Sequence, residues 1–407
     1  MRILHINKFF DLSDGVDIYL HQVMQRQEVL GHETHILSTR DPKNVPTADS
    51  KYFVERFDLS RSEGVREDAE KAIRFLWNRE AQHSLQEMIR MQRPDVIHLH
   101  NIYHHLSTSI LAPIREAGIP CVQTLHDYKL ACPNYRMFTE GEVCERCKGG
   151  KYFEAVKHGC LASGFVPNVL AALEMGMTKA RQSYERTVRL FLCPSRFMLE
   201  KMEDWGEPVG KLRHLANPVE LPSDAMTGGG GYLLYAGRLA TEKGLASFLE
   251  AAIRIPELPV KIAGRGPDEE RLRSLVRGSG VTHIEFVGFQ TGEGLRGLRA
   301  RAEALVSPSI WYENASLSIL EGMADGLPCL VTRIGGNPEL IEDGETGFLA
   351  KPGDVEDWVR VLRRFQAVSK VGRQQMGEAA REKIKERFLW STHLEKLQGF
   401  YREAGAS

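Results

Sequence analysis

The sequence predicts an α/β protein that consists of two domains, each built around a parallel β-sheet. The chain has 407 residues, which is more than one hydrophobic core normally organises. In both halves, short apolar runs alternate with amphipathic helical stretches, as expected for β-α-β units. A linker begins at Ala216 and ends in the glycines 228–231. We therefore predict one domain at residues 1–217 and a second at residues 218–388.

The composition excludes several classes of protein. The chain is 42% hydrophobic and 26% charged, with a net charge of -1, which indicates a globular protein and argues against nucleic acid as a partner. No apolar run reaches the ~20 residues that a membrane-spanning helix needs. Residues 1–6 alternate like a strand and lack a signal-peptide cleavage site. Seven cysteines, an odd number, favour a reducing compartment, so we expect a cytoplasmic protein.

The first domain opens with a strand at residues 2–7, a loop that contains Gly15, a helix at residues 18–30 and a strand at residues 33–38. This order is Rossmann-like, but the Gly-x-Gly-x-x-Gly fingerprint of dinucleotide-binding proteins is absent from the sequence. The opening therefore predicts the fold without predicting a dinucleotide.

Two later strands of this domain end in polar residues. The strand at residues 94–101 ends in His100 and Asn101, with His104 and His105 nearby, and the strand at residues 121–125 is followed by His126 and Asp127. Ligands bind at the carboxyl ends of strands in open α/β sheets. We expect the first cluster to contact an acceptor rather than to bind a metal, because it has no fixed ligand spacing.

Four cysteines lie in a loop-rich insertion at residues 132–160. Cys132, Cys144, Cys147 and Cys160 have the spacing C-x11-C-x2-C-x12-C. Four thiolates around a central C-x2-C match a tetrahedral zinc site, with Zn–S distances of ~2.3 Å. Unlinked thiols, disulfides and an iron–sulfur cluster are the alternatives. Any zinc here would be structural, because four thiolates leave no open coordination position.

The second domain opens with a strand at residues 232–236, followed by Gly237, Arg238 and Lys243. Either cation alone would be interpreted as a surface residue. Together, five residues apart at the end of a strand, they form a natural clamp for the two charges of a diphosphate.

The stretch at residues 304–347 carries two further charges. An apolar strand at 304–310 precedes a polar loop with Glu313, and a helix is expected at 317–324, capped by Asn314 or Ser316. Such a helix start suits a phosphate. Glu321 would lie about 6 Å along the axis from Leu317, beside a ribose, and Glu313 on the side of the outer phosphate. Glu321 has apolar neighbours and therefore needs a partner or ligand.

Three motifs together resemble a known family. Glu313 and Glu321 form Glu-x7-Glu, residues 335–339 read Gly-Gly-x-Pro-Glu, and residues 343–348 read Asp-Gly-x-x-Gly-Phe. This set resembles the retaining glycosyltransferases of family 4, and the resemblance covers nearly the whole chain. It implies the GT-B fold, in which two Rossmann-like domains face each other across a cleft and the last helix, at residues 389–407, packs back on the first domain.

The resemblance also implies roles for single residues. His126 would lie over the donor sugar, Arg238 and Lys243 would bind the diphosphate, Glu313 would hold sugar hydroxyls and support an oxocarbenium-like centre, and Glu321 would hold the ribose. The loop at Gly15, where the family has two adjacent glycines and this chain has Asp14-Gly15, would approach a phosphate or acceptor. Further donor contacts are expected from Phe289, Asn314, Ala315, Ser316 and Leu317.

The resulting prediction is a retaining hexosyltransferase that uses a UDP- or GDP-sugar and a glycan, lipid-linked or small-molecule acceptor. The sequence contains no Asp-x-Asp, so we expect no catalytic metal. A helical stretch at residues 161–189 carries methionines and basic residues, which is typical of core packing and less often of contact with the inner face of a membrane. The alternatives are a sugar-nucleotide epimerase or hydrolase of the same fold, and a non-catalytic sugar-nucleotide-binding protein.

Overall fold

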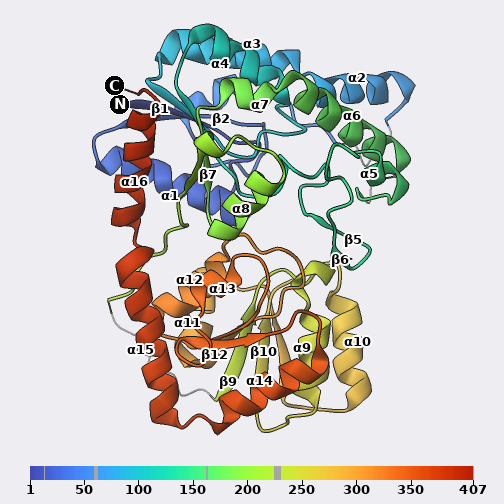
Figure 1. Cartoon of the computed structure of the whole chain (residues 1–407), viewed down its shortest axis with the longest axis vertical. Helices are drawn as coiled ribbons and strands as arrows, with labels where there is room; N and C mark the ends of the chain where they lie inside the picture. Colours follow the sequence, from blue (N-terminus) through green and yellow to red (C-terminus); the bar gives the residue numbers. More distant parts are fainter. Residues whose placement is uncertain (13, 59–62, 162–163, 224–230, 407) are drawn as a thin grey trace.

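The computed structural model describes residues 1–12, 14–58, 63–161, 164–223 and 231–406. Each half of the chain forms a domain around a six-stranded parallel sheet, and the two domains are stacked along the long axis of the molecule (Figure 1). A two-stranded antiparallel ribbon in the first domain, β5 (Phe138–Thr139) with β6 (Glu142–Val143), is the third sheet. The predicted α/β class is confirmed.

The first sheet has the strand order β2-β1-β3-β4-β7-β8. Its central strands β1, β3, β4 and β7 are buried almost throughout, which explains why they read as continuous apolar runs rather than as alternating ones. The strands are β1 (Arg2–Ile6), β2 (Glu33–Leu37), β3 (Val96–Leu99), β4 (Cys121–Thr124), β7 (Leu190–Cys193) and β8 (Leu212–His214).

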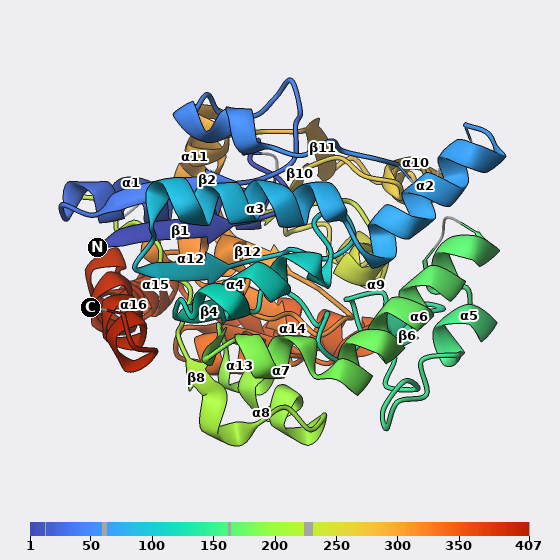
Figure 2. The ribbon, with the colours of Figure 1, turned by 90° about the horizontal axis from the view of Figure 1, so that it is seen from above.

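Helices cover both faces of this sheet. They are α1 (Gly15–Val29), α2 (Val65–Leu76), α3 (Arg79–Gln92), α4 (Leu111–Ala117), α5 (Glu154–Lys157), α6 (Phe165–Arg181), α7 (Ser183–Thr187) and α8 (Arg196–Asp204), with 3₁₀ turns η1 (Ala48–Tyr52), η2 (Thr108–Ile110) and η3 (Val209–Lys211). Figure 2 shows α2, α5 and α6 together at one end of the domain. The single helical stretch expected at residues 161–189 is divided between α6 and α7.

The second sheet has the order β11-β10-β9-β12-β13-β14. Its strands are β9 (Tyr232–Ala236), β10 (Val260–Ala263), β11 (Ile284–Gly288), β12 (Ala302–Ser307), β13 (Cys329–Thr332) and β14 (Gly347–Ala350). Its helices are α9 (Leu245–Ile253), α10 (Glu269–Ser279), α11 (Gly292–Arg301), α12 (Leu317–Ala324), α13 (Asn337–Leu340) and α14 (Val355–Ala367), with the 3₁₀ turn η4 (Thr241–Lys243). The strand order changes direction between β9 and β12, since β10 and β11 follow on one side of β9 and β12 to β14 on the other, so the carboxyl ends of β9 and β12 border a crevice.

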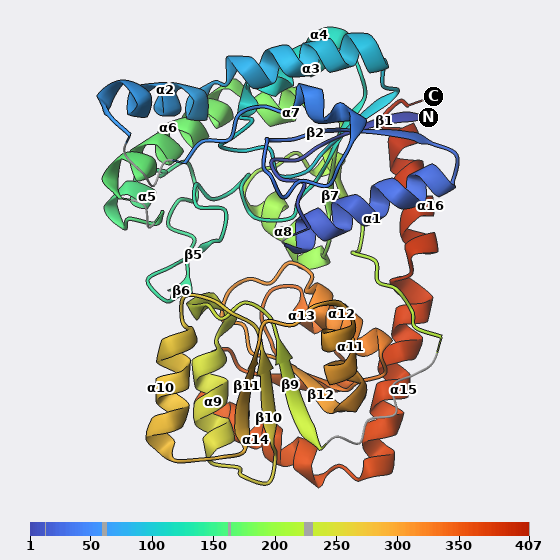
Figure 3. The same cartoon turned by 180° about the vertical axis from the view of Figure 1, so that it is seen from behind.

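The last two helices run along one side of both domains (Figure 3). Helix α15 (Lys370–Arg387) packs against α12, whereas α16 (Trp390–Glu403) packs on the first domain. The apolar side chains Trp390, Leu394 and Leu397 of α16 share a core with Ile3 and Val122 of the first domain. The first domain is therefore completed by the end of the chain.

The methionine-containing part of α6 is divided between core and surface. Met175 is buried and Met177 is exposed, and the ammonium group of Lys179 is paired with the carboxylates of Glu185 and Glu207. Among the residues that the structure describes, no helix combines the length and the apolar character that crossing a bilayer requires.

Candidate functional site

A cavity of about 720 Å³ lies between the two domains. The first domain contributes the start of α1 and His126, two residues after β4, and the second contributes the ends of β9 and β11 together with the start of α12. All eleven residues that the sequence assigned to donor binding or catalysis line this cavity: Gly15, His126, Arg238, Lys243, Phe289, Glu313, Asn314, Ala315, Ser316, Leu317 and Glu321.

The carboxylate of Glu313 is buried and paired with a cation. Its Oε1 accepts hydrogen bonds from Lys243 Nζ, at 2.7 Å, and from the Ser309 hydroxyl. Burial alone would raise the pKa of Glu313, but the charge of Lys243 and these hydrogen bonds hold the pKa below its usual value. Glu313 is therefore an anion at neutral pH, and Lys243 is shared between this carboxylate and any ligand in the cavity.

The loop that carries Glu313 is held by a close backbone contact. Gly335 has φ +59°, and a Cβ atom at this position would lie 2.2 Å from the carbonyl oxygen of Glu313. Only glycine fits both the left-handed conformation and this distance. The Gly-Gly pair of the sequence motif therefore lies directly against the backbone of the Glu313 loop and fixes its position.

Helix α12 begins at Leu317, as the sequence predicts, but the predicted side-chain cap is wrong. Ser316 makes no capping hydrogen bond and instead pairs its hydroxyl with that of Ser318. Asn314 reaches across to the first domain, where its amide donates to the carbonyl oxygen of Leu125 and its Oδ1 accepts from the Ser195 hydroxyl. No capping side chain therefore uses the first-turn N–H groups of α12, and a helix start of this kind binds anions.

Glu321 has a partner that the sequence analysis missed. Arg299, on α11, donates to Glu321 Oε2 at 2.8 Å and also to the carboxylate of Asp325. Burial raises the pKa of Glu321 although the charge of Arg299 opposes this shift. The need for a partner was foreseeable from the apolar neighbours of Glu321, but 22 residues separate it from Arg299.

His126 lies at the first-domain wall of the cavity and is hydrogen-bonded to a buried histidine. Its Nε2 is 2.9 Å from His100 Nδ1, and its ring meets that of Tyr19 edge-on. Burial lowers the pKa of His126 to about 3, so the ring is neutral at physiological pH. On the same wall, a Cβ atom on Gly15 would lie 3.3 Å from the Leu317 side chain, so the start of α1 lies close to the start of α12.

The predicted polar cluster after β3 is dispersed. His100 is fully buried, and neither Asn101, His104 nor His105 lines the cavity. The ring of His104 stacks on Phe75, and the ring of His105 packs edge-on against Phe57. These contacts are aromatic packing, and they place the two histidines away from the donor site.

The four cysteines of the insertion are neighbours but are not arranged as a closed metal site. Burial raises the pKa of Cys132 to about 11 and that of Cys147 to about 12, and the neighbouring thiols add to both shifts. Among the described residues, no three of the four sulfur atoms lie within 4.8 Å of one another, and all seven cysteines are free.

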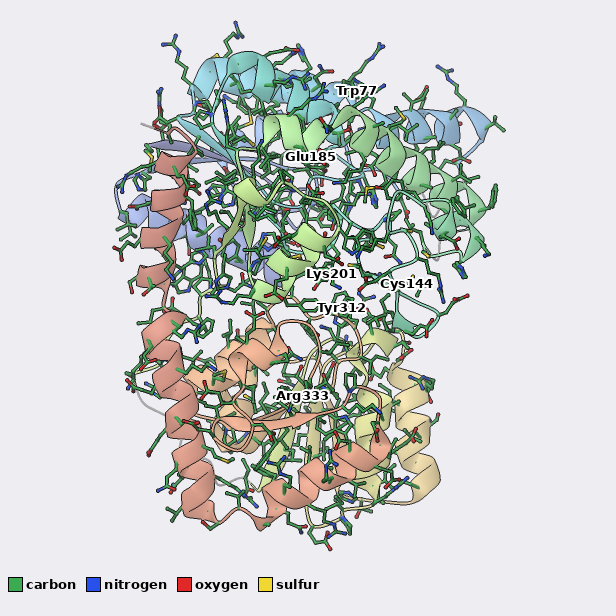
Figure 4. All side chains as sticks on the ribbon, in the orientation of Figure 1. Trp77, Cys144, Glu185, Lys201, Tyr312 and Arg333 are labelled. Atoms are coloured by element: carbon green, nitrogen blue, oxygen red, sulfur yellow. The ribbon has the colours of Figure 1, made fainter. Side chains whose placement is uncertain are left out.

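The insertion also contacts the second domain. Glu145 accepts hydrogen bonds from the Tyr312 hydroxyl, at 2.9 Å, and from Lys201 Nζ, at 2.7 Å. Figure 4 shows Lys201 and Tyr312 next to each other at the junction of the two domains. The Cys-rich insertion is therefore one of the contacts between the two domains.

Comparison with known proteins identifies the family. The model described as "Glycosyltransferase Family 4" matches residues 13–222, and "Glycosyl transferases group 1" matches residues 224–383. The chain belongs to glycosyltransferase family 4. The two models meet at the predicted linker, and together they cover both walls of the cavity. The predicted family is thus confirmed, and the protein is a transferase.

Individual relatives of this glycosyltransferase are more distant. The sulfoquinovosyl transferase SQD2 of Arabidopsis thaliana is 34% identical over 169 residues, which are 41% of this chain and 32% of the plant protein. A glycogen synthase of Mycobacterium tuberculosis is 26% identical over 313 residues, 74% of this chain and 67% of that protein. The chain thus matches only about a third of the length of the plant relative.

Solved structures confirm the predicted GT-B fold. Sucrose-phosphate synthase from Thermosynechococcus elongatus superposes with a TM-score of 0.71 at 17% identity and covers 99% of this chain and 98% of its own. Anabaena HepE in complex with UDP and glucose superposes with a TM-score of 0.70 at 14% identity, over 99% and 100% of the two chains.

Proposed function

We propose that this glycosyltransferase transfers a sugar from a nucleoside-diphosphate donor to an acceptor, with retention of the anomeric configuration. One observation carries the proposal. The cavity between the domains brings a paired Lys243 and Glu313, the start of α12 and the carboxylate of Glu321 to one surface. Its volume of about 720 Å³ is within the ~300–1,000 Å³ range of ligand sites.

In this proposal the donor lies along α12. Its diphosphate rests on the first-turn N–H groups, between Arg238 and Lys243, and its ribose hydroxyls bond to Glu321. Phe289, which is exposed at the end of β11, would contact the base. The UDP named for the Anabaena structure supports a nucleotide of this kind, and a UDP- or GDP-sugar is our proposed donor.

The difficult step of such a reaction is departure of the nucleoside diphosphate, which gains negative charge in the transition state. Arg238, Lys243 and the α12 amides would stabilise this charge, and the anionic Glu313 would stabilise the positive charge that develops on the sugar. Arg238 and Lys243 would supply the positive charge that a metal ion would otherwise supply. The absence of Asp-x-Asp from the sequence fits this proposal of metal-independent catalysis.

We propose that the first domain binds the acceptor, a glycan, a lipid-linked sugar or a small molecule, in the cytoplasm. A peripheral membrane contact stays a prediction. Its most suitable surface is on α6, where the side chains of Phe165, Val166 and Leu173 are exposed.

A structural zinc ion on Cys132, Cys144, Cys147 and Cys160 is also a proposal. The clustering of the four thiols in one loop supports it, because Zn²⁺ binds thiolates and would displace the protons that these thiols otherwise hold. Binding would have to draw the sulfur atoms closer together than they lie in the structure. The ion would hold an insertion that reaches the second domain through Glu145.

The decisive experiment combines binding with turnover. Thermal shifts with UDP, GDP and ADP identify the base, because a bound nucleotide stabilises the fold by mass action. Arg238→Ala should then lower kcat/KM by about two orders of magnitude, the usual loss for one charge-stabilising donor. Lys243→Ala should have a similar effect, but it also leaves Glu313 buried without its cation, so Arg238→Ala is the cleaner test.

Lys261→Ala is a suitable control, since Lys261 lies on β10 in the same domain, pairs with Glu285 and does not line the cavity. Near-normal turnover in Arg238→Ala would remove the clamp from the mechanism. Release of free sugar at the same rate with and without acceptors would instead establish the hydrolase alternative.

A further inference from the structure

A continuous chain of hydrogen bonds crosses the interior of the first domain and ends at His126. It starts at the Thr124 hydroxyl and passes through side chains of β4, β3, α16, α1 and β1. The links are His98–Thr124 at 2.8 Å, Tyr401–His98 at 2.8 Å, Gln27–Tyr401 at 3.1 Å, His5–Gln27 at 2.8 Å, His5–His100 at 3.1 Å and His100–His126 at 2.9 Å.

Three members of this chain resemble a metal site but are better explained by the hydrogen bonds. The ligand atoms of His5, His98 and His100 lie within 4.8 Å of one another. However, both ring nitrogens of each histidine already have a hydrogen-bond partner in the chain. The trio is therefore a connected polar core rather than a set of free ligands.

All the imidazoles of the chain are neutral. Burial lowers the pKa of His5 to about 4 and that of His126 to about 3, and it lowers those of His98 and His100 well below the usual value. A neutral imidazole has one N–H donor and one bare nitrogen acceptor. Each histidine therefore donates a hydrogen bond from one ring nitrogen and accepts one at the other, so all the bonds of the chain point the same way.

The side-chain amide of Gln27 fixes this direction. Its nitrogen can only donate and bonds to the Tyr401 oxygen, whereas its carbonyl oxygen can only accept and bonds to His5 Nε2. The Tyr401 hydroxyl then donates to His98 Nδ1, and His98 Nε2 donates to Thr124.

The same logic continues to the cavity. His98 Nδ1 is bare and accepts from Tyr401, whose oxygen accepts from the Gln27 amide. The carbonyl oxygen of Gln27 accepts from His5 Nε2, so His5 Nδ1 is bare and accepts from His100 Nε2. The bare Nδ1 of His100 then accepts from His126 Nε2. The opposite direction would require the carbonyl oxygen and the amide nitrogen of Gln27 to exchange places.

We propose that this chain fixes His126 in the Nε2–H tautomer and presents its bare Nδ1 to the cavity as an acceptor for a hydroxyl group of the donor sugar. Among the described residues, Nδ1 has no hydrogen-bond partner in the protein, and His126 lines the cavity. His100, His5, Gln27 and Tyr401 are then positioning residues. The inference rests on the proposed function only in naming the sugar; the tautomer follows from the hydrogen bonds alone.

The tautomer can be measured without any assay of activity. Nitrogen-15 NMR of protein labelled at histidine distinguishes a protonated from a bare ring nitrogen, and comparison with His126→Gln assigns the signals of His126. At about pH 7 we expect a protonated Nε2 and a bare Nδ1. A protonated Nδ1, or an equal mixture of the two tautomers, would overturn the proposal whether or not the protein proves to be a transferase.

Tyr401→Phe tests the middle of the chain, because it removes only the hydroxyl that joins Gln27 to His98. Tyr184→Phe is the matched control, since the Tyr184 hydroxyl is equally buried in the first domain but has no hydrogen-bond partner among the described residues. We expect Tyr401→Phe to give a mixture of His126 tautomers and to lower kcat roughly 2- to 10-fold, the value of one hydrogen bond, at unchanged donor KM. Equal tautomer populations and equal kcat in the two variants would refute the relay.

Discussion

Lowering the pH from about 7.5 to about 5.5 should destabilise the first domain selectively. Four histidines in this domain are fully or almost fully buried and neutral: His5, His98, His100 and His393. Their pKa values lie near or below about 4 in the folded state, whereas the pKa of an unfolded histidine is about 6.5. As the pH falls through about 6.5, the unfolded chain therefore binds protons that the folded domain cannot bind, and this lowers the free energy of unfolding.

Three carboxyl groups act in the opposite direction. Burial raises the pKa of Asp17 to about 8 and also raises those of Asp127 and Glu207, so they bind a proton more readily in the folded state. Near pH 6 these carboxyl groups release at most about three protons on unfolding, whereas the four histidines take up about three. His105, His126 and His214, whose pKa values burial also lowers, take up about two more. The net uptake of about two protons corresponds to about 3 kcal/mol per pH unit. Since domains are stable by only about 5–15 kcal/mol, two pH units remove a large part of this stability.

The second domain is an internal control, because His283 is the single histidine of residues 218–388. Hydrogen exchange measured by mass spectrometry at a series of pH values would follow peptides from β1 and β3 beside peptides from β9 and β12, after correction for the intrinsic exchange rate. We expect protection to fall in the first pair well before the second. Parallel loss in both domains, or unchanged protection of β1 at pH 5.5, would show that the histidines are not held neutral as described.

Three further outcomes are expected. Glu321→Gln should weaken binding of the free nucleoside diphosphate in calorimetry, whereas Glu313→Gln should preserve this binding and abolish transfer; the reverse pattern would mean that the donor lies the other way along α12. Purified protein should contain about one zinc ion per chain, Cys147→Ser should lose it and Cys329→Ser, in the second-domain core, should keep it, while a metal-free wild type by elemental analysis would exclude the site. Asp17→Asn should stabilise the protein by about 1–3 kcal/mol at pH 8 but much less at pH 4. Between these pH values Asp17 ionises in the unfolded chain but not in the folded domain, so ionisation stabilises only the unfolded wild type. Equal urea midpoints for the two proteins at pH 8 would contradict the raised pKa.

Local patterns predicted the elements of this fold well, because they depend on neighbouring residues. The start of α12 at Leu317 follows from an apolar helical run after a polar loop, and the position of Glu321 on that helix follows from its period. His126 follows the end of β4 and Arg238 follows the end of β9. Ligands bind at the carboxyl ends of such strands, so the local pattern also placed these two residues at the crevice.

Interactions between distant residues were beyond the sequence. Asn314 is a good capping residue by type, but its amide binds Leu125, 189 residues away, and this contact exists only once the domains meet. Arg299 could not be assigned to Glu321 from spacing, and His98 bonds to Tyr401 across 303 residues. A single sequence records which residues need a partner, whereas only the fold determines which partner each receives.

The return of α16 to the first domain has a consequence for synthesis of the protein. Tyr401 and His393 supply hydrogen bonds to side chains of β3 and α1, so these polar groups have no partner when β8 leaves the ribosome. About 175 more residues must be translated before α16 emerges, which takes roughly 10–35 seconds at ~5–20 residues per second. During that interval the nascent first domain contains an unfinished polar interior. It should be a client of chaperones until the last helix docks.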